Sequence, residues 1–417
     1  KPLHKVAGFE MISWVIDAAR SAGAEPIIPV ISNNTPDLAS FLSGYSIAIQ
    51  KNRNGTADAV MAALPHIKNR DQPILVLYAD TPFINKDIMC ELLDNIKSGS
   101  DICVLGFNAE DPSGYGRLVT SSTGSLDAII EDSEASSSQK MITNVNAGIM
   151  AFNGSIIEET IRKITPSNSK QEYFLTDIVS VGSKNNLSVD FILTDKEHVI
   201  GINNLAQLAI AESVAQNNLR RKAMLSGVTM IAPETVFLQK DTIFGQDVII
   251  EPNVVIAGGV SIASNCHIKS FCHLEKCSIG EGNMIGPFAR IRPDTVTSQN
   301  VKIGNFVEVK KSTLGEGAKV NHLSYVGDTQ LGDNANIGAG TITCNYDGYR
   351  KYETKIGNGA FIGSNTALVA PVTIGYNAII GAGSTITQDV PNDGLSLSRS
   401  EQTIISSGAE KVRNKRK

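Results

Sequence analysis

The sequence predicts two differently built parts, an α/β domain with a mainly parallel sheet and a parallel β-helix, joined by a helical arm. From Lys1 to about Asp195, short apolar runs alternate with helix-like segments, which is typical of crossover units that connect parallel strands. From about Ile243, aliphatic residues recur every six positions. That period is typical of hexapeptide repeats, in which each hexad forms one wall of a triangular prism.

The first part contains five apolar runs that predict strands and two clear helical patterns between them. In open sheets of this class, ligands bind beyond the carboxyl ends of the strands. The residues that follow each strand are therefore candidates for a binding site. The predicted strands are residues 26–32, 45–50, 73–80, 101–107 and 146–152, and the helical patterns are residues 56–67 and 85–96.

Apolar residues three or four positions apart predict a helical arm between the two parts. We expect an α/β domain over residues 1–201, the arm over 202–226, the β-helix over 227–400 and a basic tail over 401–417. The apolar positions of the arm are Leu205, Leu208, Ala211, Ala215, Leu219 and Ala223.

The hexad repeat is long enough for about seven or eight coils of three hexads each. It is interrupted between Ile337 and Ile356 by the segment TITCNYDGYRKYETK. A polar insertion of this kind is either an ordinary loop or a loop that projects to a ligand or partner. The aliphatic positions include Ile256, Ile262, Ile268, Leu274, Ile279, Ile285, Ile291, Leu331, Ile337, Ile356, Ile362, Leu368, Ile374, Ile380 and Ile386.

Composition limits the classes of function. The chain has 417 residues and a net charge of −5, so bulk charge does not favour binding to nucleic acid or a membrane surface. The sequence shows neither an apolar run long enough to cross a bilayer nor a charged-then-apolar leader pattern, so neither a membrane span nor a secretion signal is expected. Six cysteines without CxxC spacing favour a reducing, cytoplasmic location.

Cysteine and histidine gather in SNCHIKSFCHLEKC, a composition that suggests zinc. The repeat argues against a zinc site, because Cys266 and Cys272 occupy the small inward position while His267 and His273 point outward. Hexads that follow one another lie on different walls, so these side chains would not converge on one ion.

Two groups in the second part are candidates for chemistry. Arg292 and Lys310, in a basic stretch of an acidic chain, are either a phosphate site or a solvated rim. His322 lies off the inward set and is either a surface residue or a base that takes a proton from an amine. In the first part, Asp80 follows a strand and Gly55 precedes a helix, positions suited to metal and phosphate or to ordinary turns.

The residues above, with further motifs, resemble the bacterial bifunctional enzymes that acetylate glucosamine 1-phosphate and then uridylylate the product. The resemblance covers essentially the whole chain and is most specific in the second part. Its motifs are LYAD, DPSGYGR, VNAGIMAF, QEYFLTD, GINN, IGPFARIRP, GNFVEVKKSTLG, NHLSYVGD, NIGAGTITCNYDG and LVAPVTIG.

The resemblance implies a Rossmann-like nucleotidyltransferase domain that uses UTP and N-acetylglucosamine 1-phosphate. It implies that Asp80 and Asn203 hold Mg²⁺ and that Lys1 contacts phosphate. The uridyl and sugar sites would be formed by Lys1, Arg53, Gly55, Thr56, Tyr78, Asp80, Gly116, Glu131, Asn146, Glu172 and Asn203.

For the second part, the resemblance implies a left-handed β-helix that transfers the acetyl group of acetyl-CoA, with His322 as the general base. It also implies a homotrimer whose acetyl sites lie between neighbouring prisms. The sugar phosphate would be held by Arg292, Lys310, Tyr325 and Asn336, and acetyl-CoA by Ala339, Asn345, Tyr346, Ser364, Ala382 and Arg399.

The chain departs from the family in the first part. The family's Gly-rich nucleotide loop precedes the position of Lys1 and is not in the sequence given; without such a loop, a triphosphate would lack part of its cradle. Arg53 stands where the family usually has a Gln that reads uracil, and Ala79 replaces the Gly of LYGD. If the chain is the whole molecule, we expect impaired uridylyl transfer; if the loop precedes Lys1 in the intact protein, we expect the activity to stand. The selectivity for the base is less securely predicted than the type of reaction.

Two other functions would fit parts of the sequence. One is another sugar 1-phosphate nucleotidyltransferase in which the β-helix serves assembly, which leaves His322 without a role. The other is a trimeric scaffold with a degenerate ligand pocket, which would bind coenzyme A without turnover.

Overall fold

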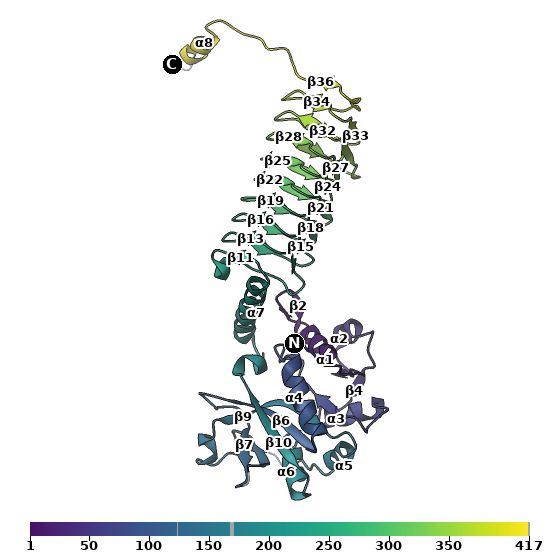
Figure 1. Ribbon diagram of the computed structural model, residues 1–417, viewed down its shortest axis with the longest axis vertical. Coiled ribbons are helices and arrows are strands. Elements are labelled where there is room, and N and C mark those ends of the chain that lie inside the picture. Colours follow the sequence, from purple (N-terminus) through teal and green to yellow (C-terminus); the bar gives the residue numbers. More distant parts are fainter. Residues whose placement is uncertain (123, 167–170, 416–417) are drawn as a thin grey trace. The chain divides into compact units, whose positions relative to one another are not determined.

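The computed structural model describes residues 1–122, 124–166 and 171–415 (Figure 1). The chain divides into two compact units, Lys1–Ala215 and Gln216–Lys417. Helix α7 (Leu205–Leu225) runs through this division, so the predicted arm is helical. Among the described residues, no helix combines the length and apolar character that a bilayer span requires.

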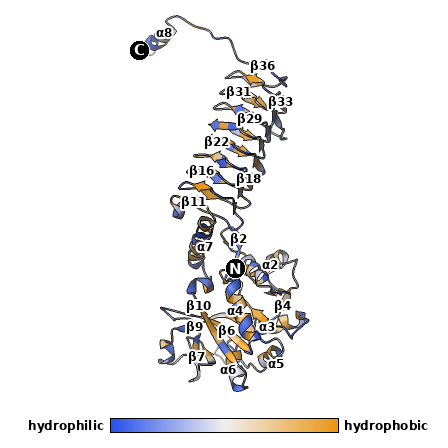
Figure 2. Cartoon of the chain, in the orientation of Figure 1, coloured by the Kyte–Doolittle hydropathy of each residue, from blue (hydrophilic) through white to orange (hydrophobic). Residues whose placement is uncertain are grey.

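A mixed sheet forms the centre of the first unit, in the order β10-β6-β9-β7-β8 with β5 on β9. Strand β6 is apolar along most of its length and is covered on both faces (Figure 2). Ile102 and Val104 pack with residues of α3, α5 and α6, while Cys103 and Leu105 pack with residues of α4. The strands are β5 (Ile74–Val76), β6 (Ile102–Asn108), β7 (Arg117–Thr120), β8 (Leu126–Ile130), β9 (Asn144–Phe152) and β10 (Val189–Thr194).

Shorter elements complete the first unit. Strands β3 and β4 form a separate parallel pair, and β1 and β2 an antiparallel one. These elements are β1 (Lys5–Val6), β2 (Phe9–Glu10), α1 (Met11–Ser21), β3 (Val30–Ser32), α2 (Pro36–Phe41), β4 (Ala48–Gln50), α3 (Thr56–Ala63), α4 (Lys86–Lys97), α5 (Ile157–Ile161) and α6 (Asp177–Lys184).

The α/β class is confirmed, but the prediction of a mainly parallel sheet is wrong. Among the described strands of the large sheet, only β10 and β6 pair in parallel, whereas β9 runs antiparallel to β5, β6 and β7. Parallel neighbours need a crossover of about a dozen or more residues, usually a helix. Between β6 and β9, the described chain contains no α-helix and only one 3₁₀ turn, Gln139–Met141.

The second unit is a prism of three parallel sheets, as the hexad repeat predicted. We call the sheets the first, second and third walls, and the chain passes from the third to the first to the second in each coil. The first wall has the order β11-β13-β16-β19-β22-β25-β28-β31-β34-β36, the second β14-β17-β20-β23-β26-β29-β32-β35 and the third β12-β15-β18-β21-β24-β27-β30-β33.

Strands of the prism are short because each wall is one hexad wide. Those of the first wall are β11 (Thr229–Met230), β13 (Ile249–Ile250), β16 (His267–Ile268), β19 (Met284–Ile285), β22 (Lys302–Asn305), β25 (Lys319–His322), β28 (Asn336–Ile337), β31 (Phe361–Ile362), β34 (Ile379–Ile380) and β36 (Leu395–Ser396). Those of the second are β14 (Val255–Ile256), β17 (His273–Leu274), β20 (Arg290–Ile291), β23 (Glu308–Lys310), β26 (Tyr325–Gly327), β29 (Ile342–Cys344), β32 (Ala367–Val369) and β35 (Thr385–Ile386). Those of the third are β12 (Ile243–Phe244), β15 (Ser261–Ile262), β18 (Cys277–Ile279), β21 (Thr295–Thr297), β24 (Thr313–Leu314), β27 (Thr329–Leu331), β30 (Thr354–Ile356) and β33 (Val372–Ile374). Helix α8 (Gly408–Asn414) follows them.

The aliphatic hexad positions fill the axis of the prism in one continuous core. Each predicted position from Ile256 to Ile386 is at most 3% exposed. Cys266 and Cys272 belong to the same core, so the inward direction predicted for them is confirmed. Burial raises the pKa of Cys272 to about 11, which keeps its thiol protonated at neutral pH.

A column of exposed apolar residues follows the corner between the first and second walls. It consists of Phe271, Phe288, Phe306 and Leu323, which we call the corner ladder. The three phenylalanine rings stack with centroid separations of 4.8 and 5.1 Å. All four residues have left-handed backbone, with φ between 49° and 62°, and are between 45% and 62% exposed.

The interruption of the repeat is a loop that leaves one coil of the prism. On the third wall, Leu314 pairs with Leu331 after a coil of ordinary length, whereas Leu331 pairs with Ile356 after a longer coil that contains the insertion. The pairing of the walls therefore resumes after the insertion. Tyr349 at the tip of this loop is 93% exposed, as expected for a projecting segment.

Candidate active sites

Three predicted residues, Lys1, Asp80 and Asn203, meet beyond the carboxyl end of β5 in the first unit. The Ile202 N–H donates to the Asp80 carbonyl at 3.0 Å, which brings Asn203 beside Asp80. The Lys1 ammonium donates to Asp80 Oδ2 at 2.5 Å and to Asn203 Oδ1 at 2.8 Å. Both oxygens thus converge on one positive charge, and carboxylate and amide oxygens are ligands that suit Mg²⁺. The three predicted residues lie together, and the donor set fits the metal.

A cavity of about 390 Å³ lies beside the start of α3 and includes four predicted residues, Arg53, Gly55, Thr56 and Glu172. Gly55 has φ +115°, and a Cβ there would collide with the backbone of Tyr173. Only glycine allows this close approach at the start of the helix.

Gln50 lines the same cavity, although the sequence reasoning did not select it. Its Nε2 donates to the Gly55 carbonyl and to Asp58 Oδ2, each at 2.8 Å. Arg53 donates to Ser32 Oγ at 2.8 Å. The signal for Gln50 was present, because this residue ends a predicted strand at the edge where ligands bind.

The predicted sugar-site residues form a connected group. The Asn146 N–H donates to the Gly116 carbonyl at 2.8 Å, and a Cβ on Gly116 would lie 3.7 Å from Glu131 Oε1. Asn146 Oδ1 accepts from the Gly148 N–H at 2.9 Å, and a Cβ on Gly148 would lie 3.0 Å from the Tyr78 ring. Burial raises the pKa of Tyr78, so its hydroxyl remains a neutral hydrogen-bonding group.

In the second unit, the structure brings predicted sugar-phosphate and acetyl-CoA residues into one cluster at the far edge of the second wall. Asn345 Nδ2 donates to Asp328 Oδ2 at 2.5 Å and to the Tyr325 hydroxyl at 3.4 Å. The Lys310 ammonium lies 3.8 Å from the same carboxylate oxygen. We call Lys310, Tyr325, Asp328, Asn345 and Lys351 the lysine cluster.

Lys351 is a member of this cluster that the sequence reasoning missed. Contact with Lys310 and repulsion between the two positive charges lower the pKa of Lys351. Two neighbouring ammonium groups have the chemistry that suits an anion. The residue was not apparent from the repeat because it belongs to the inserted loop, where hexad spacing says nothing about position.

Two other predicted sugar-phosphate residues lie outside the lysine cluster. Arg292 donates to Glu308 Oε1 at 2.7 Å, and Glu308 pairs with Tyr325 on the neighbouring strand, so Arg292 is adjacent to the cluster. Asn336 lies on the first wall, where it pairs with Lys319.

His322 ends strand β25 at the corner between the first and second walls. Its Nδ1 lies 2.8 Å from Asn305 Oδ1, and the two residues are paired neighbours on the first wall. An amide oxygen can only accept, so Nδ1 carries the proton, and in the neutral imidazole Nε2 then has the free lone pair. Among the described residues, no hydrogen bond joins His322 to the lysine cluster.

Four predicted acetyl-CoA residues lie at the same corner of the prism as His322, in the coils that follow it. The Gly340 N–H donates to the His322 carbonyl at 3.3 Å, and that of Asn365 to the Ala339 carbonyl at 2.7 Å. Arg399 donates to the Ala382 carbonyl at 2.8 Å. We call His322, Ala339, Ser364, Ala382 and Arg399 the histidine column.

Tyr346 lies apart from the histidine column, in the inserted loop. Its hydroxyl donates to the Gly348 carbonyl at 2.5 Å.

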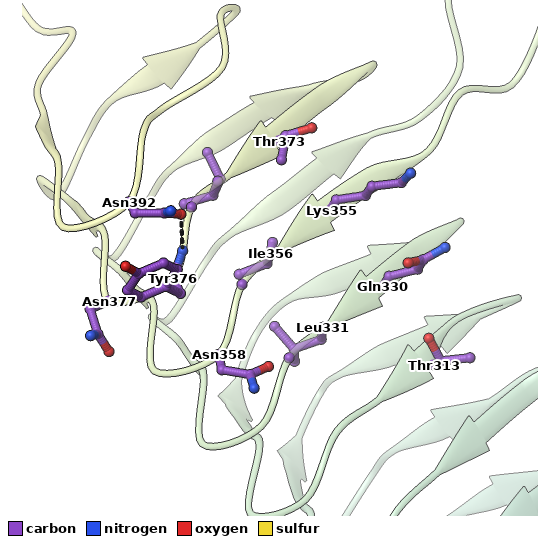
Figure 3. A pocket seen from close by; sticks show the side chains of 14 residues that line it. Thr313, Gln330, Leu331, Lys355, Ile356, Asn358, Thr373, Tyr376, Asn377 and Asn392 are labelled. Atoms are coloured by element: carbon purple, nitrogen blue, oxygen red, sulfur yellow. Dashed lines mark hydrogen bonds between the residues drawn. The ribbon is translucent and has the colours of Figure 1, made fainter.

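A hollow of about 840 Å³ lies on the third wall of the second unit (Figure 3). Thr313, Gln330, Lys355 and Thr373 form a row along it, and Tyr376 stands near its end. None of the predicted site residues lines it. The predicted chemistry thus lies on the other edges of the prism.

Two protein-family descriptions match the chain in its two parts. Residues 1–146 match the MobA-like NTP transferase domain. Residues 241–276 and 353–388 match the bacterial transferase hexapeptide of six repeats. These matches agree with a nucleotidyltransferase first unit and a hexapeptide prism in the second.

Relatives match over the whole chain. Bifunctional protein GlmU of Bartonella quintana is 43% identical over 99% of this chain and 93% of its own length. The GlmU protein of Chelativorans sp. is 46% identical over 100% of this chain and 92% of its own length. The GlmU protein of Xanthobacter autotrophicus is 47% identical over 99% of this chain and 93% of its own length. The chain therefore belongs to the family of the bifunctional protein GlmU.

Proposed function

We propose that the second unit acetylates glucosamine 1-phosphate with acetyl-CoA and that the first unit transfers a uridylyl group from UTP to the product. The outcome is UDP-N-acetylglucosamine, the product of the family to which the chain belongs. The observation that carries the proposal is His322, with Nδ1 engaged and Nε2 free, at the head of the histidine column.

The acetyl transfer needs a base because the attacking amine must lose a proton. The amine nitrogen attacks the thioester carbonyl and its proton passes to Nε2 of His322, so that a C–N bond forms. The C–S bond then breaks, and the coenzyme A thiolate takes the proton from the imidazolium. A positioned general base contributes about 10²- to 10⁴-fold to such a step.

The phosphate of the amino sugar is assigned to Lys310, Lys351, Arg292, Tyr325 and Asn336. Two ammonium groups, a guanidinium and a hydroxyl offer charge-assisted hydrogen bonds to a phosphate dianion. The phosphate also relieves the repulsion between Lys310 and Lys351.

A homotrimer would complete the acetyl site. The histidine column and the lysine cluster occupy opposite edges of the second wall, with β26 (Tyr325–Gly327) between them. A neighbouring copy that covers the corner ladder would bring its own lysine cluster to His322. Contiguous exposed apolar surface of this kind is typical of protein interfaces, and Leu323 places the ladder directly beside the base.

In the first unit, a phosphate oxygen of N-acetylglucosamine 1-phosphate attacks the α-phosphorus of UTP, and the bond to pyrophosphate breaks. Asp80 and Asn203 would hold Mg²⁺, which when bound would supply positive charge to the triphosphate. The chain's own contribution is to position both reactants and to neutralise charge with Lys1. The cavity of Gln50, Arg53 and Gly55 is assigned to the base of the nucleotide. Both co-substrates are cytoplasmic metabolites, so we assign the protein to that compartment.

The variant His322→Ala tests this assignment. Acetyl transfer, followed as release of the coenzyme A thiol, should fall by about 10²-fold or more. Pyrophosphate release from UTP and N-acetylglucosamine 1-phosphate should stay at the wild-type level, because that site lies in the first unit. His273→Ala, which removes an exposed histidine of the same prism, is the matched control.

Retained acetylation in His322→Ala would refute the role of His322. A wild-type protein that binds coenzyme A without turnover would favour a scaffold. A protein that releases pyrophosphate but never acetylates would favour a nucleotidyltransferase whose prism serves assembly.

A further inference from the structure

Asp328 is a nearly buried carboxylate at the centre of the lysine cluster, where no substrate role is assigned to it. Its side chain is 7% exposed. Its N–H donates to the Lys310 carbonyl at 3.0 Å, and its own carbonyl accepts from the Thr354 N–H at 3.1 Å. The backbone is therefore tied to the coils on both sides, which fixes the position of the carboxylate.

The carboxylate is shared by residues from different parts of the chain. Oδ2 accepts from Asn345 Nδ2 at 2.5 Å and lies 3.8 Å from the Lys310 ammonium, while Oδ1 lies 3.3 Å from the Lys311 ammonium. The charge of Asp328 also acts on Lys351, and there it opposes the effect of Lys310. A carboxylate out of water is favourable only with such partners.

Because of this arrangement, two groups of substrate residues depend on one negative charge. Lys310 and Lys351 repel each other, and Asp328 holds them together before any phosphate arrives. Asn345, which is assigned to acetyl-CoA, has its amide nitrogen directed to Asp328 and to the Tyr325 hydroxyl. Its position thus depends on the same carboxylate that positions the phosphate-binding lysine.

We propose that Asp328 is a positioning residue that couples the sugar-phosphate subsite to the acetyl-donor subsite through its contacts with Lys310 and Asn345. The inference rests on the proposed acetyl transfer. Asp328 does not touch the reacting atoms, so it acts on the placement of both substrates rather than on the proton transfer at His322.

Asp328→Asn keeps the size of the side chain and removes its charge. We expect the KM for glucosamine 1-phosphate and the KM for acetyl-CoA each to rise about tenfold, the loss of one charge-assisted contact. The value of kcat should stay within about threefold of wild type, since the base is unchanged. Calorimetric titration with coenzyme A alone should show the weaker donor binding without turnover.

If Asp328 couples the two subsites, a substitution in the acetyl-donor subsite should change the KM for the sugar phosphate. A merely structural role of Asp328 does not predict this effect. Asn345→Ala should raise the KM for glucosamine 1-phosphate in the wild-type background and have little effect in the Asp328→Asn background. The first of these measurements does not require Asp328→Asn to fold. Asp333→Asn is the matched control, because this exposed aspartate of the next coil accepts a bond from the Glu316 N–H at 2.8 Å and belongs to neither subsite.

The outcomes separate this inference from the proposed function. If the wild-type protein acetylates and both KM values of Asp328→Asn are unchanged, the coupling role is refuted and the acetyl transfer stands. A lower melting temperature and a lower kcat with unchanged KM values would make Asp328 a structural residue only. A wild-type protein without acetyl transfer would refute the proposed function itself.

Discussion

His322 has one ring nitrogen engaged and one free, and this asymmetry decides what the residue can do. Asn305 reaches Nδ1 from the preceding coil at 2.8 Å. The partner fixes both the tautomer and the direction of the ring. The orientation of the His322 ring thus depends on the stacking of two coils, because the pairing of β22 with β25 places Asn305 opposite His322.

Replacing Asn305 tests this dependence. Asn305→Ala should lower kcat for acetyl transfer about tenfold with KM values unchanged, because the free nitrogen is no longer fixed on Nε2. Asn305→Asp should retain most of the activity, since a carboxylate also accepts from Nδ1. Its charge favours the imidazolium, so the acidic limb of the pH profile should move to higher pH. Equal losses in both variants, without that shift, would contradict the role.

Lys1 occupies the position between the two oxygens assigned to Mg²⁺. Its ammonium is bonded to both Asp80 and Asn203, so a divalent cation must displace it. In Lys1→Met without nucleotide, Mn²⁺ should bind several-fold more tightly, a gain on the order of 1 kcal/mol. Electron paramagnetic resonance of free Mn²⁺ measures this, with Lys5→Met as control because Lys5 pairs instead with Glu10 at 3.6 Å. Unchanged Mn²⁺ affinity would show that the ammonium does not compete.

At the scale of the element, the prism buries its inward cysteines, of which Cys272 is 2% exposed and Cys277 4%. Burial raises the pKa of Cys272 to about 11 and that of Cys277 to about 12. Both values lie above the ordinary value of 9.0. The unfolded chain therefore loses these protons first, and the free energy of unfolding should fall as the pH rises above about 9.

Thiol labelling checks the same feature. With a disulfide reagent at pH 8, we expect the half-buried Cys90 and Cys344 to react quickly in the native protein. The four buried thiols should react only in denaturant, because thiolate, not thiol, is the nucleophile and burial keeps them protonated and out of reach. Fast native labelling of Cys272 would mean that the prism opens on the timescale of the reaction. The four slow residues are Cys103, Cys266, Cys272 and Cys277.

Elements whose signal is local could be predicted from the sequence, and strand pairing could not. The hexad spacing predicted the three walls because every coil repeats the same contact between neighbours. Strand β9 was also expected, but its antiparallel pairing with β6 depends on contacts with a strand from a much earlier part of the chain. An apolar run shows that a strand is buried, not which neighbour it pairs with.

At the scale of the whole molecule, the proposed homotrimer makes the acetyl site depend on assembly. We expect Phe288→Glu to disrupt the corner ladder, because the charge would lie between Phe271 and Phe306 in the proposed interface. Light scattering after size exclusion should show monomers and a large loss of acetyl transfer, with pyrophosphate release unchanged. Met141→Glu, at a residue 79% exposed in the first unit, is the control. A trimer that survives Phe288→Glu would place the contact elsewhere.

The candidate sites show the same limit of sequence reasoning. The motifs selected Lys310, Tyr325 and His322 together, but the structure separates them across the second wall. Neighbouring letters in a hexad motif point to different edges of a prism, so sequence proximity overstates spatial proximity. Lys351 was missed because it is distant from Lys310 in the sequence. The inserted loop brings its side chain to Lys310 on an earlier coil.

The long coil has a practical meaning for protein engineering. Its extra residues leave the prism between Leu331 and Ile356, and the next paired position, Ile374, follows after a coil of ordinary length. The pairing of strands on the third wall therefore continues on both sides of the loop. A library randomised over residues 347–350 would therefore vary the loop that follows the acetyl-CoA candidates Asn345 and Tyr346, and the stacking of the coils would be kept.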